Sequence, residues 1–426
     1  MQEQRGPLNS SDRTIAKGIQ RPELLAPAGD FEKLKTAIHY GADSVYLGDQ
    51  KFSLRNKARN FGDDELAAAL QYAHEHSVKV YITANIFARN SDLPGMRAHI
   101  TLLREIKPDA VIVSDPGVFM MLRETAPELD VHVSTQANIT NIESALFWQK
   151  MGAKRLILSR ELSIDEIAEI SKGTDIELEA FVHGSVCLSY SGKCYLSSFM
   201  ASRSANSGEC TNSCRWKYSL VEEKRPGQFF PVFEDDRGSY VMNSRDLCLI
   251  EHLPLLRRAG VSSFKIEGRM KSMYYVGCVT KVYREALDLL DEEESYRQHL
   301  PLWQKELAQF GNRGYTEGLL FGRNRQDICN TSGDAPAVQS ELAGIVVDVQ
   351  GKIAKVILKG KLSVGDAIEY LTPGLETKAM KVRSLRYEDG IEAVSAKYGE
   401  TVLITASANI RKGDLIRKYQ KHEGVQ

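Results

Sequence analysis

The chain lacks the long apolar segments that membrane spans and secretory leaders require. No apolar run among its 426 residues approaches the roughly 18 that a membrane-spanning helix needs, and its first twenty residues are polar. It also lacks a surplus of charge, because 55 Lys and Arg face 56 Asp and Glu and leave a formal net charge of −1. We therefore expect a cytoplasmic protein with no membrane partner, in which any contact with nucleic acid comes from a local basic patch.

Several common catalytic signatures are missing as well. The chain contains no GxSxG turn and no HExxH helix, so its residues give no reason to expect a serine hydrolase or a common zinc protease. No GxGxxG follows the first predicted strand, which argues against an open dinucleotide-binding sheet. Hydrophobic residues make up 42% and charged residues 26%, as in folded globular proteins. The length suits one large domain and a smaller one.

What the chain does contain is a regular alternation of strand-like and helix-like segments. Short β-branched runs are followed by amphipathic stretches whose apolar residues recur at three and four positions. Eight such units over about 270 residues favour a (β/α)8 TIM-like barrel over a doubly wound sheet. The predicted strands begin at Pro22, Ser44, Lys79, Ala110, Asp130, Arg155, Glu177 and Ser262.

The pattern changes after the barrel. Residues 291–337 are charged and then rich in Gly and Asn, and we interpret them as a connector without helical period that packs back on the barrel. From residue 338 short alternating runs separated by Gly, Asp and Pro predict a small antiparallel β-barrel domain. This domain is either a structural module or a nucleic-acid platform, although few aromatics accompany its basic residues. The predicted division is a flexible tail 1–20, a barrel 21–290 with a cysteine-rich insertion 185–240, a connector 291–337, a β domain 338–418 and a tail 419–426.

Four of the seven cysteines lie in the insertion after the seventh predicted strand. They are Cys187, Cys194, Cys210 and Cys214, with six, fifteen and three residues between successive members. In a reducing compartment clustered thiols are more often metal ligands than disulfides, and soft sulfur favours an iron-sulfur cluster or zinc. Zinc sites usually pair their cysteines closely twice over, whereas here only one pair is that close. The spacing therefore favours a cluster.

A cysteine nucleophile is a second interpretation of the same segment. His183 precedes Cys187 by four residues and could lower its pKa. No other feature supports it. Cys248, Cys278 and Cys329 stand apart, and Cys278 falls in an apolar helical run where we expect it to be buried.

Polar side chains collect at the predicted carboxyl ends of the strands, where a barrel places its active site. Lys265, Glu267 and Arg269 alternate along KIEGR, so period two directs them to one side of the strand. Burying two cations with one anion is costly without a ligand, which predicts an anion site that a carboxylate would satisfy. Our catalytic candidates are Glu179, His183, Lys265, Glu267 and Arg269. Our substrate-binding candidates are Asp115, Gln136, Asn138 and Arg160. Asp30 and Asn85 share this location, and some members of the set are expected only to cap helices or to pair with one another.

Two groups of basic residues are either RNA contacts or solvated loop charges. Arg55, Lys57 and Arg59 follow the second predicted strand, and Arg203 and Arg215 flank the last cysteines. A nearby aromatic such as Phe61 or Trp216 would add base stacking to phosphate contacts.

The segment from Glu179 to Ser197, EAFVHGSVCLSYSGKCYLS, resembles the signature of the collagenase-like peptidase family U32. That signature runs from a glutamate through HG to two cysteines separated by six residues. The resemblance continues through LLAPAGD, STQANITN, CRWKY, NSRDL, KIEGRMKS and NRGYTEGLLFG, and so covers nearly the whole chain.

The resemblance implies hydroxylation rather than proteolysis. Relatives of this type are similar to RNA and ubiquinone-pathway hydroxylases with an iron-sulfur cluster on four cysteines, and the tRNA member makes 5-hydroxyuridine at the wobble position in a prephenate-dependent reaction. It implies a 4Fe-4S cluster on Cys187, Cys194, Cys210 and Cys214, with Cys248 as a substitute ligand. It further implies tRNA and a related subunit as partners, while prephenate would suit Lys265 and Arg269. A U32-type peptidase and a noncatalytic RNA-binding subunit stay open as alternatives.

Overall fold

A computed structural model describes most of the chain between residues 21 and 419. The described residues are 21–55, 58–187, 189–190, 193–215, 244–322, 338–374, 377–406 and 409–419, with four short strands between 220 and 240. The predicted tail 1–20 lies outside them, as do residues 420–426 of the predicted tail 419–426; Tyr419 itself ends the last strand. Lys57, Trp216 and Cys329 also lie outside the described residues.

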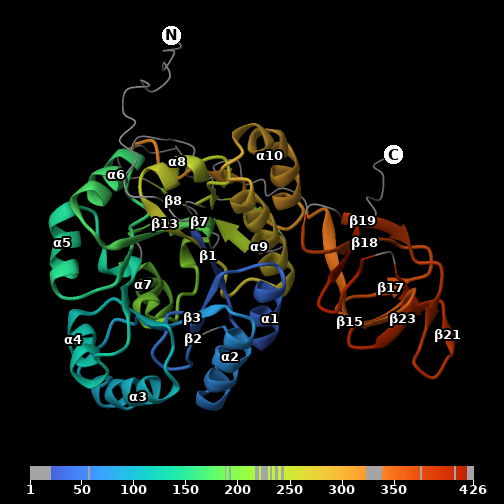
Figure 1. The fold of residues 1–426 in the computed structure, drawn as a ribbon, viewed down its shortest axis with the longest axis horizontal. Coiled ribbons are helices and arrows are strands. Elements are labelled where there is room, and N and C mark those ends of the chain that lie inside the picture. Colours follow the sequence, from blue (N-terminus) through green and yellow to red (C-terminus); the bar gives the residue numbers. More distant parts are fainter. Residues whose placement is uncertain are drawn as a thin grey trace, which may run out of the picture.

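Eight parallel strands form a closed barrel in the first part of the chain (Figure 1). Each strand pairs with the next in sequence, and the last one pairs with both β7 and β1, which closes the ring. The strands are β1 Glu23–Pro27, β2 Ser44–Gly48, β3 Lys79–Ala84, β4 Ala110–Val113, β5 Val131–Val133, β6 Arg155–Ile157, β7 Glu177–Ser185 and β13 Val261–Ile266. Their inward and outward apolar side chains are almost fully buried, as expected where helices cover a parallel sheet.

Helices connect successive strands and surround the barrel (Figure 1). They are α1 Phe31–His39, α2 Asp63–Glu75, α3 Leu93–Ile106, α4 Pro116–Thr125, α5 Ile142–Lys150, α6 Ile164–Gly173, α8 Leu253–Arg258 and α9 Met273–Asp288. The predicted (β/α)8 TIM-like barrel is confirmed. None of the helices in the described part of the chain is both long and apolar enough to cross a membrane.

The cysteine-rich insertion extends from the end of β7. It contains the helix α7 Leu196–Ala201, 3-10 turns at Ala205–Ser207 and Ser213–Arg215, and the short strands β8 Leu220–Val221, β9 Phe229–Phe230, β10 Phe233–Asp235 and β11 Gly238–Tyr240. The chain then returns through β12 Asp246–Cys248, which pairs antiparallel with β7. This return anchors both ends of the insertion at the carboxyl end of β7.

The connector after the barrel is more regular than its composition suggests. We expected helical period to end near residue 291, which was wrong, because α10 spans Glu293–Leu307. Its buried residues Tyr296, Trp303 and Leu307 fall on one helical face, and the indole of Trp303 donates to Glu285 of α9 (3.2 Å). The connector does pack back on the barrel, since β14 Tyr315–Thr316 pairs with β12.

The C-terminal domain is a curled antiparallel sheet with its own core, as predicted for a small β domain. Its strand order is β19-β18-β24-β15-β16-β23-β20-β21. The strands are β15 Ser340–Gln350, β16 Ile353–Leu358, β18 Ala367–Leu371, β19 Thr377–Lys381, β20 Leu385–Arg386, β21 Glu392–Ala393, β23 Thr401–Thr405 and β24 Leu415–Tyr419, and β17 Leu362–Ser363 pairs separately with β22 Ser395–Ala396.

This domain docks on the outer helices of the barrel (Figure 1). The hydroxyl of Tyr40 donates to the carbonyl of Leu371 (2.7 Å) and accepts from the amide of Leu415 (2.9 Å). Arg417 lies buried between Glu306 of α10 and Glu369 of β18, and donates to both carboxylates. The docking residues therefore come from the sides of the barrel and not from the strand ends that carry the candidate site.

Candidate active site

A cavity of about 390 Å³ lies where the carboxyl ends of the barrel strands meet the cysteine-rich insertion. The four clustered cysteines and the KIEGR residues line the same space, although they come from separate segments of the chain, the insertion after β7 and the end of β13. Among the described lining residues five cations face one carboxylate. They are Arg55, Arg160, Lys265, Arg269 and Lys271, with Glu267 as the carboxylate. The cavity is therefore suited to an anionic ligand.

Lys265 forms part of the cavity wall at the end of β13. Its ammonium donates to Glu179 Oε1 (2.8 Å) and lies 4.5 Å from the ring centre of Tyr46. Burial lowers the pKa of Lys265 below its ordinary value, and the Glu179 carboxylate opposes that shift. The Lys265 ammonium is only partly neutralised, because the Glu179 carboxylate that accepts from it also accepts from Arg155.

Arg269 is a buried cation held by neutral groups. Its Nη1 donates to the hydroxyls of Ser53 (2.6 Å) and Thr83 (2.7 Å), and its Nε has no partner in the described structure. Burial lowers the pKa of Arg269 to about 10, so the guanidinium stays charged near neutral pH. Gly48 permits this position, because a Cβ there would lie 2.3 Å from Nη1. An unneutralised buried guanidinium next to a cavity is a ready site for a carboxylate.

Glu267 occupies the wall between two arginines. Its carboxylate lies 3.5 Å from Arg160 Nη2 and 3.9 Å from Arg55 Nε. Arg160 also donates to the Ser185 carbonyl (2.8 Å) and stacks on Phe181, with its guanidinium 3.9 Å from the ring centre. Arg55, for which we expected either an RNA contact or a solvated loop charge, lines the cavity.

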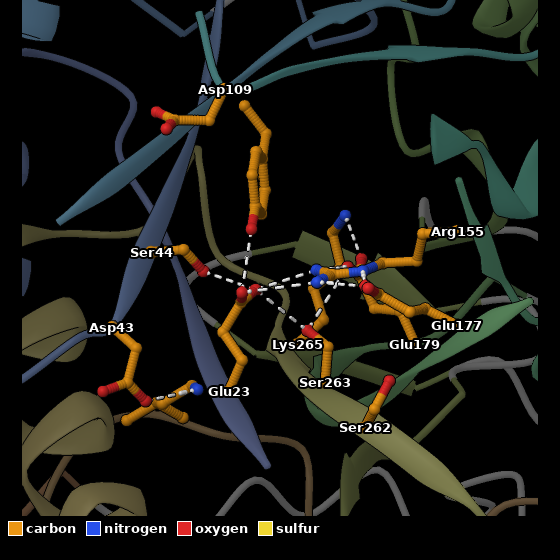
Figure 2. A network of polar contacts seen from close by, with 12 residues as sticks. Glu23, Asp43, Ser44, Asp109, Arg155, Glu177, Glu179, Ser262, Ser263 and Lys265 are labelled. Carbon is orange, nitrogen blue, oxygen red and sulfur yellow. Dashed lines mark hydrogen bonds and ion pairs between the residues drawn. The ribbon is translucent and has the colours of Figure 1, made fainter. Parts of the chain in front are cut away.

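Below the cavity a charged network fills the barrel interior (Figure 2). Arg155 donates to Glu23 Oε1 (2.8 Å), Glu177 Oε2 (2.8 Å) and Glu179 Oε2 (3.2 Å). Burial alone would lower the pKa of Arg155, but Glu179 and Glu23 raise it above its ordinary range. Glu179 thus joins Arg155 to Lys265, and the network fixes the base of the cavity.

Glu179 lies beneath the cavity wall and not among its lining residues. It is fully buried and contacts Lys265, Arg155 and Ser263. Its position supports a role in holding Lys265, in place of the direct catalytic role that we predicted. The alternation of side chains along β7 directs Glu179 into the barrel, but at a level below the residues that line the cavity.

His183 also lies away from the cavity, which corrects our expectation that it assists Cys187. The ring packs against Tyr275, Tyr283 and Tyr315, and Nδ1 lies 3.2 Å from the Tyr283 hydroxyl. The Tyr283 hydroxyl donates to the Val182 carbonyl (2.9 Å), so Nδ1 of His183 is the donor to Tyr283. A register shift between β7 and β13 at this point breaks the period-two alternation that would have turned His183 inward.

The burial of His183 has a measurable pH dependence. Burial lowers the pKa of His183 from 6.5 to about 3, with Asp246 opposing and Lys271 reinforcing the shift. In the unfolded chain the histidine gains a proton near its ordinary pKa of 6.5, while in the folded protein it stays neutral. The contribution of neutral His183 to stability is therefore complete above pH 6.5 and decreases as the pH is lowered below it. When the pH is lowered from about 7 to about 5, we expect protonation of His183 in the unfolded chain to lower the unfolding free energy by about 2 kcal/mol.

Denaturant unfolding of wild type and His183→Gln at the two pH values measures this effect. The glutamine cannot titrate, so the pH-dependent loss should be about 2 kcal/mol smaller in the variant, whatever its absolute stability. Equal losses in the two proteins would show that His183 is solvated or charged in the folded state.

Two of the four substrate-binding candidates line the cavity and two do not. Gln136 and Arg160 line the cavity, beside Asn85. Asp115 instead caps α4, where its Oδ1 accepts from the amides of Gly117 (2.8 Å) and Val118 (3.0 Å). Asn138 adopts a left-handed conformation after the turn Thr135–Ala137 and does not line the cavity.

Asp30 and Phe61, named above beside the candidate residues, have structural roles. Asp30 caps α1 through the amide of Lys33 (2.9 Å). Phe61, a candidate for base stacking, is a core residue with 1% of its surface exposed. Strand-end polarity alone could not separate such caps from ligand-binding residues, because both occur where a strand gives way to a helix.

Two of the cysteines outside the cluster, Cys248 and Cys278, lie in the described part of the chain and pack within the barrel domain. Cys278 is buried in α9, as predicted, and burial raises the pKa of its thiol well above the usual range. Cys248 lies 3.9 Å from the Tyr283 hydroxyl, and burial raises its pKa to about 11. Cys248 does not line the cavity, so the structure does not place this substitute ligand with the other four cysteines.

Comparison with models of protein families shows which family the chain belongs to. The model of peptidase family U32 matches residues 29–330, and that of the U32 C-terminal domain matches residues 339–417. The chain belongs to peptidase family U32. The two matched segments meet at the start of β15, where the barrel and connector give way to the C-terminal sheet.

Similar U32-related proteins carry names of different activities. The chain is 38% identical over 398 residues to tRNA hydroxylation protein P of Escherichia coli K12, covering 83% of this chain and 86% of that protein. It is 38% identical over 371 residues to the 23S rRNA 5-hydroxycytidine C2501 synthase of the same organism, covering 82% and 52%. It is 31% identical over 417 residues to a collagenase of Porphyromonas gingivalis W83, covering 94% and 98%.

The four clustered thiols of this U32 protein are the donor atoms that a soft metal centre requires. Cys187, Cys194, Cys210 and Cys214 all line the cavity, and the amide of Asn212 donates to Cys210 Sγ (3.4 Å). Such N–H to sulfur bonds tune iron-sulfur clusters. In the described part of the chain no three Cys, His, Asp or Glu side chains are yet close enough to hold a metal ion. Binding a cluster therefore requires the four thiols to draw together around the cavity mouth.

Proposed function

We propose that this protein hydroxylates the wobble uridine of tRNA to 5-hydroxyuridine in a prephenate-dependent reaction. The observation that carries the proposal is that one cavity joins four cysteines to a surplus of cations, two of them buried. A redox centre and a site for an anionic co-substrate would then face the same reacting base. The names of the two E. coli relatives, which refer to RNA hydroxylation, support this assignment.

Cys187, Cys194, Cys210 and Cys214 would hold an iron-sulfur cluster of the 4Fe-4S type. When bound, such a cluster supplies one-electron redox chemistry, with a potential set by hydrogen bonds and solvent exposure. The chain contributes the amide of Asn212 as one such hydrogen-bond donor to Cys210.

The cations of the cavity would hold the two carboxylates of prephenate. Arg269 offers an unpaired Nε and a charge that Ser53 and Thr83 do not neutralise. Lys265 and Arg160 offer a second contact, each anchored by one carboxylate partner. Two separated cationic positions favour a dicarboxylate over a monocarboxylate, and Glu267 between Arg160 and Arg55 disfavours a third negative group nearby.

The peptidase alternative has less support from the site. It rests on the family name and on the relative named collagenase. The cysteine protease that the sequence allowed needs a histidine beside Cys187, whereas His183 is buried against three tyrosines.

Nucleoside analysis of tRNA tests the proposal directly. A deletion strain, also lacking any close paralogue, should lose 5-hydroxyuridine and the nucleosides made from it. Wild-type protein should restore them, and Arg269→Met should not, because the variant lacks the unneutralised guanidinium. An unchanged nucleoside profile on deletion would refute the function.

Purified protein separates the alternatives. Cleavage of a peptide by strictly metal-free protein would establish the peptidase. Restoration of the modified nucleoside by Arg269→Met would indicate that the cavity is not catalytic and would favour a noncatalytic RNA-binding subunit that works with a related chain.

A further inference from the structure

Exposed apolar side chains border the cavity mouth, although the same residues would be expected inside a protein. Tyr195 and Phe199 on α7 are 74% and 77% exposed. Met270, a cavity-lining residue, is 45% exposed, and Phe87 after β3 is 42% exposed. We call these four residues the apolar rim. Large apolar side chains gathered at a cavity mouth commonly mark a binding surface.

Backbone hydrogen bonds hold the apolar rim beside residues that line the cavity. Tyr195 directly follows Cys194, and the amide of Phe199 donates to the Tyr195 carbonyl (3.0 Å), which places the two rings one turn apart on α7. The amide of Phe87 donates to the carbonyl of Asn206 in the same insertion (3.1 Å), and Asn206 lines the cavity. The rim therefore has a set position relative to the thiols.

Positive charge accompanies the apolar rim. Lys193 Nζ lies 4.7 Å from the ring centre of Phe87. Lys271, which follows Met270 in the chain, has its Nζ 5.2 Å from the ring centre of Tyr275. Between residues 193 and 215 the basic residues are Lys193, Arg203 and Arg215, against the single acid Glu209. The whole chain has a net charge of −1, so this local excess distinguishes the mouth from the average surface.

Flat exposed rings interleaved with cations are complementary to single-stranded nucleic acid. Bases stack on aromatic side chains whatever their identity, and the cations follow the phosphates. A base must leave its stack to reach a catalytic group inside a cavity, and the nucleotides on either side then need new stacking partners. The apolar rim lies where those neighbours would be.

We propose that the apolar rim stacks the nucleotides flanking a target base that enters the cavity from a single-stranded RNA loop. This inference rests on the proposed function and adds to it the surface that holds the RNA. Tyr195 and Phe199 stack one flanking base, Phe87 stacks the other, and Lys193 and Arg203 contact phosphates.

Fluorescence anisotropy with a short RNA tests the apolar rim without catalysis. The probe is a fluorescein-labelled single strand of about seven nucleotides with a central uridine. The double variant Tyr195→Ala/Phe199→Ala should raise the Kd at least about tenfold, because each lost stacking contact weakens binding by about that factor or more. Tyr195→Trp/Phe199→Trp should bind as well as wild type, since stacking is retained.

Leu302→Ala is the matched control, because Leu302 is an exposed apolar side chain (58%) on α10, away from the cavity lining. It should leave the Kd unchanged. An equal Kd for wild type and the double alanine variant would overturn the proposal. So would light scattering that shows a dimer of this chain which Phe199→Ala converts to monomer, or a peptide that displaces the RNA from the mouth.

The binding assay separates failure of the apolar rim from failure of the proposed function. Loss of RNA affinity in the double variant, with an unchanged nucleoside profile in the deletion strain, would retain the rim and reject uridine hydroxylation. Unchanged affinity, with lost nucleosides on deletion, would retain the hydroxylase and reject the rim.

Discussion

Replacing Arg155 with methionine is expected to lower the free energy of unfolding by about 3–5 kcal/mol. The guanidinium is buried in the barrel and donates to Glu23, Glu177 and Glu179 (Figure 2). Methionine fills similar volume but leaves buried carboxylates without a counter-charge, and removing one partner of a buried ionic network is much more costly than removing the whole network. Denaturant unfolding at neutral pH measures the loss.

Arg104→Met provides the matched control. Arg104 pairs with Glu128 (2.9 Å) on the protein surface, where both side chains are about half exposed. Solvent screens that pair, so its loss should leave the unfolding free energy nearly unchanged. Similar losses for the Arg155 and Arg104 variants would mean that water or a proton compensates the interior carboxylates.

The network also connects fold stability to the site. Glu179 accepts from both Arg155 and Lys265, so loss of Arg155 leaves Lys265 as the remaining cation on that carboxylate. The stronger pairing would hold Lys265 closer to Glu179 and farther from a ligand. We therefore interpret the interior charges as the support that positions the cavity lysine.

The barrel was predictable because its local signals agree with its packing. The predicted strands at Ser44 and Lys79 begin where β2 and β3 begin, and their β-branched or aromatic runs are buried on both faces. The missed helix α10 has charged residues through most of its length and Pro301 inside it, so its three buried residues gave a weak periodic signal. Its burial depends on α9, which composition alone could not indicate.

The candidate site was predictable only in part. The order of the chain placed the cysteines after β7, and period two placed Lys265 on the cavity side. The same rule failed at His183, because a register shift and the left-handed Gly184 (φ 109°) change the direction of the chain there. Arg155 and Glu23 went unnoticed since they begin their strands, at the end of the barrel opposite the expected active site.

The apolar rim gave a signal in sequence that we did not use. Tyr195 and Phe199 are four residues apart immediately after Cys194, a spacing that places both rings on one side of a short helix. Sequence could not tell that α7 stands at a cavity mouth, because that position follows from the return of the chain through β12. The solvent exposure of Tyr195 and Phe199 identified the rim, and that exposure follows from the tertiary structure.

The second large effect concerns the metal centre. Wild-type protein purified without oxygen is expected to be coloured and to contain iron, whereas Cys194→Ser should lose most of both the iron and the visible absorbance. A serine hydroxyl is a harder ligand and stays protonated near neutral pH, so it does not replace a thiolate on a soft cluster. Cys194 lines the cavity with Cys187, Cys210 and Cys214, and in the proposed 4Fe-4S cluster the three remaining thiolates would leave one iron without a protein ligand.

Cys248→Ala is the control that separates ligation from a general effect of removing a thiol. Cys248, the last residue of β12, lies outside the cavity and 3.9 Å from the Tyr283 hydroxyl. Burial raises its pKa to about 11, so it is a poor thiolate. Its variant should retain iron and colour. Loss of iron from the Cys248 variant with retention in Cys194→Ser would exchange the roles of these two residues. A colourless wild type that contains zinc would instead make the four cysteines a structural site and remove redox chemistry from the cavity.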